Sequence, residues 1–168
     1  TVPTGILGLW LNQWDKLIFG SVMFSALTLL INGAILLLPK FIKVKSNNLN
    51  NQSAILVGIA QGIAVLPGIS RSGSTIVSGL LLGLKPEAAY NFSFLISLPA
   101  ILAAQILHFN DLNLVATELV NYGAGFIAAF ISGYFALIWL RRLVSRGRLT
   151  GFAYYCLILG ILLILKNN

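Results

Sequence analysis

Long apolar runs separated by short polar or basic segments dominate the chain. The first, Phe19–Leu38, has 20 residues without a charge. As a helix it would cover about 30 Å, the thickness of the hydrocarbon core of a bilayer. The other predicted spans are Ala88–Leu107, which contains Pro99, then Glu118–Leu140 and Leu149–Leu165. Pro99 predicts a kink in its span. The pattern therefore predicts an all-α, polytopic membrane protein.

The interval 53–84 differs, because its two apolar arms are too short to cross a bilayer. Ser53–Leu66 would reach roughly 21 Å as a helix, and Thr75–Leu84 roughly 15 Å. Polar Pro67–Ser74 lies between them. The pairs Gly58-x-x-x-Gly62 and Gly79-x-x-x-Gly83 predict close helix contacts on both arms. The interval is either one broken span or a re-entrant hairpin that leaves the membrane on the side it entered.

Loop charge discriminates between these two topologies. The net charge is +7, and the basic residues gather in two clusters: Lys40, Lys43 and Lys45, then Arg141, Arg142, Arg146 and Arg148. Only a re-entrant hairpin places both clusters in the cytoplasm, as the positive-inside rule requires. We therefore predict a re-entrant hairpin over 53–84 within a single membrane domain, 1–168, whose last residues lie outside.

Composition supports the membrane class and excludes others. Hydrophobic residues make up 58% of the chain and charged residues only 9%, whereas a soluble domain carries roughly 25% charged residues. Basic loops beside anionic lipid explain the positive charge, so nucleic acid is not an expected partner. Cys156, the single cysteine, forms no internal disulfide and no cysteine-based metal site.

Arg71 is the residue that the membrane class does not explain. An arginine within a membrane costs at least about 2.5–3.5 kcal/mol on insertion scales, and such residues usually mark function. Its guanidinium presents donors in a fork that suits phosphate oxygens. A helix is predicted to begin near Thr75, and unpaired N–H groups at a helix N-terminus favour an anion. The alternative is a structural ion pair of Arg71 with a carboxylate.

Other polar groups flank Arg71. The candidate hydroxyls are Ser70, Ser72, Ser74 and Thr75. The last three could instead only cap the second arm. Gly68 and Gly73 allow positive φ and a close approach of the backbone to a ligand. Gln61 could bond the loop or a ligand, or make a helix–helix hydrogen bond. The sequence thus predicts a phosphate or diphosphate cradle, with no carboxylate close by and no metal-ligand cluster.

The loop Pro67–Thr75 (PGISRSGST) resembles the second signature loop of the undecaprenyl-diphosphate phosphatase family, also called the bacitracin-resistance family. Gly58–Gly62 (GIAQG) looks like the arm before that loop, and Asn91–Ala100 (NFSFLISLPA) like the span after it. The resemblance covers essentially the whole chain and corresponds to the C-terminal half of the family.

The resemblance implies a phosphatase of the bacterial inner (plasma) membrane. Such an enzyme converts undecaprenyl diphosphate to undecaprenyl phosphate, so that the lipid carrier is recycled for peptidoglycan synthesis, and it confers bacitracin resistance. The implied fold is an inverted repeat with two facing re-entrant hairpins. Arg71 would neutralise the diphosphate, while Ser70, Ser72 and Thr75 would position its oxygens or line the site. The nucleophile stays open, and a homodimer is one option for the assembly.

The chain departs from the family pattern in one respect. The family's first signature, a Glu-x-x-x-Glu arm and a serine-rich loop ending in His, is absent, and Gln61–Pro67 looks like its counterpart without carboxylates. We expect an upstream half to supply the acid/base groups and the ligands of Mg²⁺ or Ca²⁺, and this chain alone to be inactive. A naturally split protein that needs a partner subunit is one alternative. A transporter or lipid flippase with a mid-membrane anion site is another.

Overall fold

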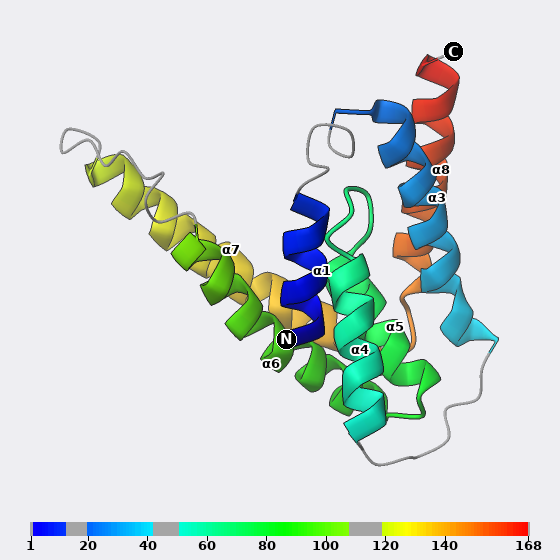
Figure 1. The fold of residues 1–168 in the computed structure, drawn as a ribbon, viewed down its shortest axis with the longest axis horizontal. Helices are drawn as coiled ribbons and strands as arrows, with labels where there is room; N and C mark the ends of the chain where they lie inside the picture. The colour runs from blue at the N-terminus through cyan, green and yellow to red at the C-terminus, as the bar shows by residue number, and fades with distance from the viewer. Residues whose placement is uncertain (1, 13–19, 42–50, 108–118, 168) are drawn as a thin grey trace.

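The structure, a computed structural model, describes residues 2–12, 20–41, 51–107 and 119–167 (Figure 1). The regular structure within these residues is entirely helical. The elements are α1 (Val2–Asn12), α3 (Val22–Leu37), the 3-10 turn η1 (Leu38–Lys40), α4 (Asn51–Ile63), α5 (Arg71–Leu81), α6 (Pro86–Leu107), α7 (Leu119–Ser145) and α8 (Thr150–Asn167). Lys43, Lys45 and Glu118 lie outside the described residues.

By length and composition, four described segments could cross a membrane: α3 with η1, α6, α7 and α8. They coincide with the four predicted runs, and the all-helical membrane class is confirmed. Pro99 lies inside α6, where a kink stays a prediction. The prediction that the second basic cluster lies in a loop is partly wrong, because Arg141 and Arg142 belong to the last turns of α7. The helix ends at Ser145, just before Gly147, whose φ of +63° turns the backbone out of the helix.

The interval 53–84 contains two short helices, α4 and α5, that pack against each other. They would extend about 20 Å and 17 Å, less than a bilayer core. Figure 1 shows the start of α4 and the turn after α5 at the same end of the molecule, opposite the C-terminus. This is the arrangement of a helical hairpin, and its re-entrant position in a membrane stays a prediction.

The start of α5 differs from the prediction. The helix begins at Arg71 rather than near Thr75. Ser70 caps it with an extended backbone, φ −76° and ψ 113°, and its Oγ accepts a hydrogen bond from the Gly73 N–H at 3.1 Å. The cap is therefore the hydroxyl before Arg71, and not Ser72, Ser74 or Thr75.

The end of α5 explains the second glycine pair. Gly83 has φ of +91°, its N–H bonds the Leu80 carbonyl at 3.0 Å, and the Leu84 N–H bonds the Gly79 carbonyl at 3.0 Å. These two bonds form a Schellman motif that stops the helix. Gly79 does allow a close helix contact, since a Cβ there would lie 3.1 Å from Cβ of Ala89 in α6. Gly83 lies in the turn after the helix, so the pair does not form one face of α5.

Small residues also bring α3 and α8 together along their length (Figure 1). A Cβ at Gly33 would lie 2.7 Å from Leu157 Cγ, and one at Gly160 would lie 2.8 Å from Leu30 Cδ2. Each glycine therefore makes room for a leucine of the partner helix. The adjoining core joins α3, α5, α6, α7 and α8 through Leu36, Ile76, Val77, Leu80, Leu84, Ala89, Val144, Leu149, Ala153 and Cys156. This packing fixes the position of α5.

Candidate functional site

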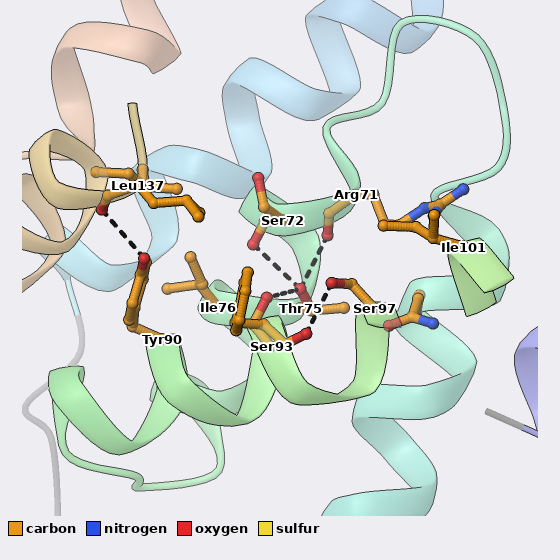
Figure 2. Close-up of a pocket in the computed structure, with 12 residues that line it drawn as sticks. Arg71, Ser72, Thr75, Ile76, Tyr90, Ser93, Ser97, Ile101 and Leu137 are labelled. Carbon is orange, nitrogen blue, oxygen red and sulfur yellow. Dashed lines mark hydrogen bonds between the residues drawn. The ribbon is translucent and has the colours of Figure 1, made fainter. Parts of the chain in front are cut away.

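A cavity of about 470 Å³ lies beside the first turns of α5 (Figure 2). Its polar lining consists of Gln61 from α4, Arg71, Ser72 and Thr75 from α5, and Tyr90, Ser93 and Ser97 from α6. Its apolar lining consists of Ile76, Phe94, Ile101, Leu137 and Leu140. A few convergent polar groups within apolar walls are typical of a binding site for an amphiphilic ligand.

Arg71 is the charged residue of this cavity. It is half-buried, and no ion pair of its guanidinium occurs within the described residues. The structural alternative of a carboxylate partner therefore has no support in that part of the chain. Arg71 and Ser72 are the first two residues of α5, where backbone N–H groups have no acceptor within the helix. A guanidinium and a helix N-terminus thus favour an anion at the same place.

Thr75 and Ser93 join α5 to α6 beneath Arg71. Their hydroxyl oxygens lie 2.5 Å apart, and both side chains are buried. The Thr75 hydroxyl also lies 2.9 Å from the Arg71 carbonyl and 3.1 Å from the Ser72 carbonyl (Figure 2). Since a hydroxyl has a single proton, Thr75 donates to one of these carbonyls and accepts from Ser93. Thr75 therefore holds the cavity wall in place.

Gln61 makes the second of its two predicted contacts, and a bond to a ligand stays a prediction. Its side chain is fully buried, and Nε2 donates to the Ile96 carbonyl of α6 at 3.3 Å, which is the predicted helix–helix hydrogen bond. It also lines the cavity. Because Nε2 must face a carbonyl, Oε1 is fixed as an acceptor, and it has no partner within the described residues.

The other predicted residues do not line this cavity. Ser70 lines a second cavity of about 350 Å³, which also contains Ser72, Gly73 and Asn32. Ser74 is buried, and its Oγ has no hydrogen-bond partner among the described residues. Gly68 lines neither cavity. The hydroxyls around Arg71 therefore lie on more than one side of α5.

The two predicted glycines also serve the fold. Gly68 has φ of +88°, as predicted, and a Cβ there would meet the Thr28 hydroxyl and lie 2.7 Å from the Ser25 carbonyl oxygen. Gly73 is helical, so the prediction of positive φ is wrong there. A Cβ at Gly73 would lie 2.9 Å from Leu36 Cδ2. Both glycines let this segment approach α3.

Asn32 is a site residue that sequence reasoning missed. It is 1% exposed, its Oδ1 accepts from the Ser70 N–H at 3.0 Å, and its Nδ2 donates to Cys156 Sγ at 3.2 Å. The Thr28 hydroxyl bonds the Pro67 carbonyl on the same side. Helix α3 therefore anchors the loop before Arg71. The available signal was an amide within an otherwise apolar run.

The hydroxyls of α6 were also missed. Tyr90, Ser93 and Ser97 are spaced by three and four residues, so they share one helix face. The Tyr90 hydroxyl donates to the Leu137 carbonyl of α7 at 3.0 Å, and the Ser97 hydroxyl donates to the Phe94 carbonyl at 2.7 Å. The polar spacing within a predicted span was a signal that could have found them.

The described residues do not fit a metal site. No group of three His, Cys, Asp or Glu side chains comes together within 2–12, 20–41, 51–107 and 119–167. The expected Mg²⁺ or Ca²⁺ has no ligand set in this part of the chain, and no chemical step can be assigned through it here.

The fold and the cavity define a polytopic membrane protein in which two short helices present an arginine between membrane-length helices. The chain belongs to the bacitracin resistance protein BacA family, which it matches over residues 1–162. It is 39% identical to an undecaprenyl-diphosphatase of Methanosphaera stadtmanae, over 99% of this chain and 62% of the relative. It is 41% identical to one of Carboxydothermus hydrogenoformans, over 96% of this chain and 65% of the relative.

A third relative, undecaprenyl-diphosphatase 1 of Bacillus cereus, is 38% identical over 96% of this chain and 62% of its own length. The chain thus spans somewhat less than two thirds of these relatives. Their matching length includes the Arg71 loop and the helices around it.

Proposed function

We propose that the protein containing this chain dephosphorylates undecaprenyl diphosphate to undecaprenyl phosphate in the inner (plasma) membrane. This reaction recycles the lipid carrier for peptidoglycan synthesis and confers bacitracin resistance. The family and the printed names of the relatives support the proposal. The observation that carries it is an arginine at the start of α5, without a described carboxylate partner, in a mostly apolar cavity.

Arg71 is the residue to which we assign charge neutralisation. Its guanidinium would hold oxygens of the diphosphate, and the Ser72 hydroxyl and the first N–H groups of α5 would donate to the remaining oxygens. The first turn of α5 is held in place before the ligand arrives, because Ser70 caps the helix and Thr75 bonds Ser93. Donors held at this place would stabilise the charge that develops on the bridging oxygen of the leaving isoprenyl monophosphate.

The apolar side of the cavity suits the first isoprene units of the lipid. Phe94, Ile101 and Leu137 lie on the same walls as the polar groups. Hydrolysis breaks the bond between the bridging oxygen and the terminal phosphorus and adds one water across it: the water oxygen ends on the inorganic phosphate, and the bridging oxygen stays with the isoprenyl monophosphate. The general base, the nucleophile and the ligands of a divalent cation are expected outside the described residues.

The test is phosphate release from a C55 or shorter isoprenyl diphosphate by the full-length protein in detergent with Mg²⁺ or Ca²⁺. Arg71→Ala is expected to lower kcat/KM about 10²–10³-fold, as loss of a preorganised charge-stabilising donor does. Arg71→Lys should recover only part of the activity, because an ammonium lacks the planar fork. Lys166→Ala, at the far end of α8, is the control and should leave activity unchanged.

Full activity of Arg71→Ala would overturn the assignment of Arg71. Movement of the lipid across vesicle membranes without any phosphate release would favour a flippase instead. The isolated 168-residue chain is expected to release no phosphate.

A further inference from the structure

Two further cavities meet where α7 ends and α8 begins. One, of about 410 Å³, is mostly apolar and is lined by Trp139, Leu143, Arg148, Gly151, Phe152 and Tyr155. The other, of about 230 Å³, is lined by Trp139, Arg142, Leu143, Arg146 and Arg148. Because they share Trp139, Leu143 and Arg148, they form one groove with an apolar part and a basic end. This groove is called the α7–α8 groove below.

The turn that carries the basic end is held by the backbone. Gly147 has φ of +63°, its N–H bonds the Val144 carbonyl at 3.0 Å, and the Arg148 N–H bonds the Leu143 carbonyl at 2.9 Å. These are the two bonds of a Schellman motif. Val144 and Leu149 on either side of the turn are buried in the core. The arginines are therefore presented by a fixed turn.

One described carboxylate, Glu87, lies close to the arginines at this end, where it lines a cavity with Arg141, Arg142 and Arg146. Arg141 pairs with Glu87 at 3.6 Å, and both side chains are exposed. Within the described part of the chain, Arg142, Arg146 and Arg148 have no carboxylate within ion-pair distance. Arginines near a helix C-terminus are favourable for the helix, but three of them around one cavity repel each other. An anion in the groove would remove this repulsion.

The apolar part of the groove is lined by residues of two membrane-length helices, α7 and α8. Trp139 is 60% exposed and Tyr155 63%, and Trp139 lies edge-on to Phe152 with ring centroids 6.0 Å apart. Exposed aromatic side chains beside a basic turn are typical of the membrane–water interface. Gly151 leaves the groove open, since a Cβ there would meet no atom within 4 Å.

We propose that the α7–α8 groove binds an anionic phospholipid, with its phosphate headgroup among Arg142, Arg146 and Arg148 and an acyl chain against Trp139 and Phe152. A soluble anion would use only the basic end. A zwitterionic lipid would bring its own cation against the arginines. The apolar and basic parts together therefore select a lipid with net negative charge. The groove shares no lining residue with the cavity beside Arg71, but its apolar part shares Trp139, Phe152 and Tyr155 with the cavity of about 350 Å³ that Ser70 and Ser72 also line. The proposal does not depend on the proposed hydrolysis.

The probe is quenching of tryptophan fluorescence by lipids with brominated acyl chains, in mixed micelles of the full-length protein. The signal from Trp139 is the difference between the native protein and Trp139→Phe. Brominated phosphatidylglycerol should quench Trp139 at a concentration about tenfold or more below that needed for brominated phosphatidylcholine, because each basic residue near an anionic surface contributes about fivefold.

Charge variants test the basic end. The triple variant Arg142→Gln/Arg146→Gln/Arg148→Gln should lose the preference for phosphatidylglycerol. The matched variant Lys40→Gln/Lys85→Gln/Lys166→Gln removes three positive charges outside the groove and should keep it. Equal quenching by the two lipids in the native protein would overturn the proposal, as would an equal loss of preference in both triple variants.

A filling variant tests the apolar part. Gly151→Leu places a side chain in open space, so the variant should fold. The leucine would occupy part of the groove, so brominated phosphatidylglycerol should quench Trp139 only at a concentration about fivefold or more higher. This is the size of effect expected for the loss of one basic contact. Gly123→Leu, also at an open position in α7, is the control and should have no effect. Displacement of the lipid by millimolar inorganic phosphate would show a free-anion site and contradict the proposal. Absence of Trp139 quenching by either lipid would show that another segment fills the groove.

Discussion

Gly68 shows how a single residue positions Arg71 without touching a ligand. Its φ of +88° turns the chain toward α5, and its missing side chain lets the loop contact Thr28 and Ser25 of α3. Gly147 has a comparable positive φ of +63°, but a Cβ there would meet no atom within 4 Å. A substitution at Gly147 would therefore add backbone strain alone, whereas one at Gly68 would add both strain and a steric clash.

Gly68→Ala is expected to destabilise the protein by about 2–4 kcal/mol, from roughly 1 kcal/mol of left-handed strain and the remainder from overpacking. Gly147→Ala should cost only about 1 kcal/mol, the strain alone. Thermal unfolding of the full-length protein in detergent measures both. Equal losses in the two variants would contradict the role of the α3 contact.

At the scale of elements, α1 and α4 show how glycine spacing sets a helix contact. Gly58 and Gly62 lie one turn apart on the face of α4 that meets α1. The Thr4 hydroxyl of α1 donates to the Gly58 carbonyl at 3.0 Å, which fixes the register of the two helices. A Cβ at Gly62 would lie 2.5 Å from Leu7 Cδ1 and 2.9 Å from Leu7 Cβ, whereas one at Gly58 would lie 3.6 Å from Pro3.

Gly62→Ala should therefore lower the thermal unfolding temperature, because overpacking by about 1–3 kcal/mol outweighs the gain of about 1 kcal/mol in helix propensity. Gly58→Ala should keep or raise it, because the new methyl group enters ordinary van der Waals contact. The pair is measured side by side in detergent. A stabilised Gly62→Ala would show that α1 moves away freely.

For the whole molecule, the topology depends on which helix ends and turns lie on the same side of the membrane. Figure 1 places the start of α4 and the α5–α6 turn at one end and the C-terminus at the other. From the positive-inside rule we predict that the first end lies in the cytoplasm, together with the arginines at the end of α7 and in the turn after it. A single broken span would instead separate Asn51 from Lys85.

Single cysteines at Asn51, Lys85, Arg146 and Lys166 test this topology, since all four positions are exposed. A membrane-impermeant maleimide applied from outside should label only Lys166→Cys, and the other three should react after the cells are opened. The native protein is the background, with Cys156 buried. Labelling of Lys85→Cys from outside would show one broken span.

The helices were predictable because the signal for a span is local. Length and hydropathy over about 20 residues decide whether a segment can cross a bilayer, whatever its neighbours are. The short arms and Arg71 were predictable for the same reason, since a charge and two glycines interrupt an apolar pattern within a few residues. The helix ends were less predictable, because Ser70, Ser72 and Ser74 are equally good N-caps by residue type alone.

The residues that form the cavity wall could not be predicted from local sequence patterns. Asn32 bonds the Ser70 N–H across 38 residues of sequence, and Ser93 bonds Thr75 across 18. No pattern within one helix reveals such a pair. The sequence alone determined the membrane class, the four spans and the arginine between two short arms, because these depend on local hydropathy and charge. Only the tertiary structure decided which hydroxyls line the cavity with Arg71 and which anchor the loop, because that depends on how α3 and α6 pack against α5.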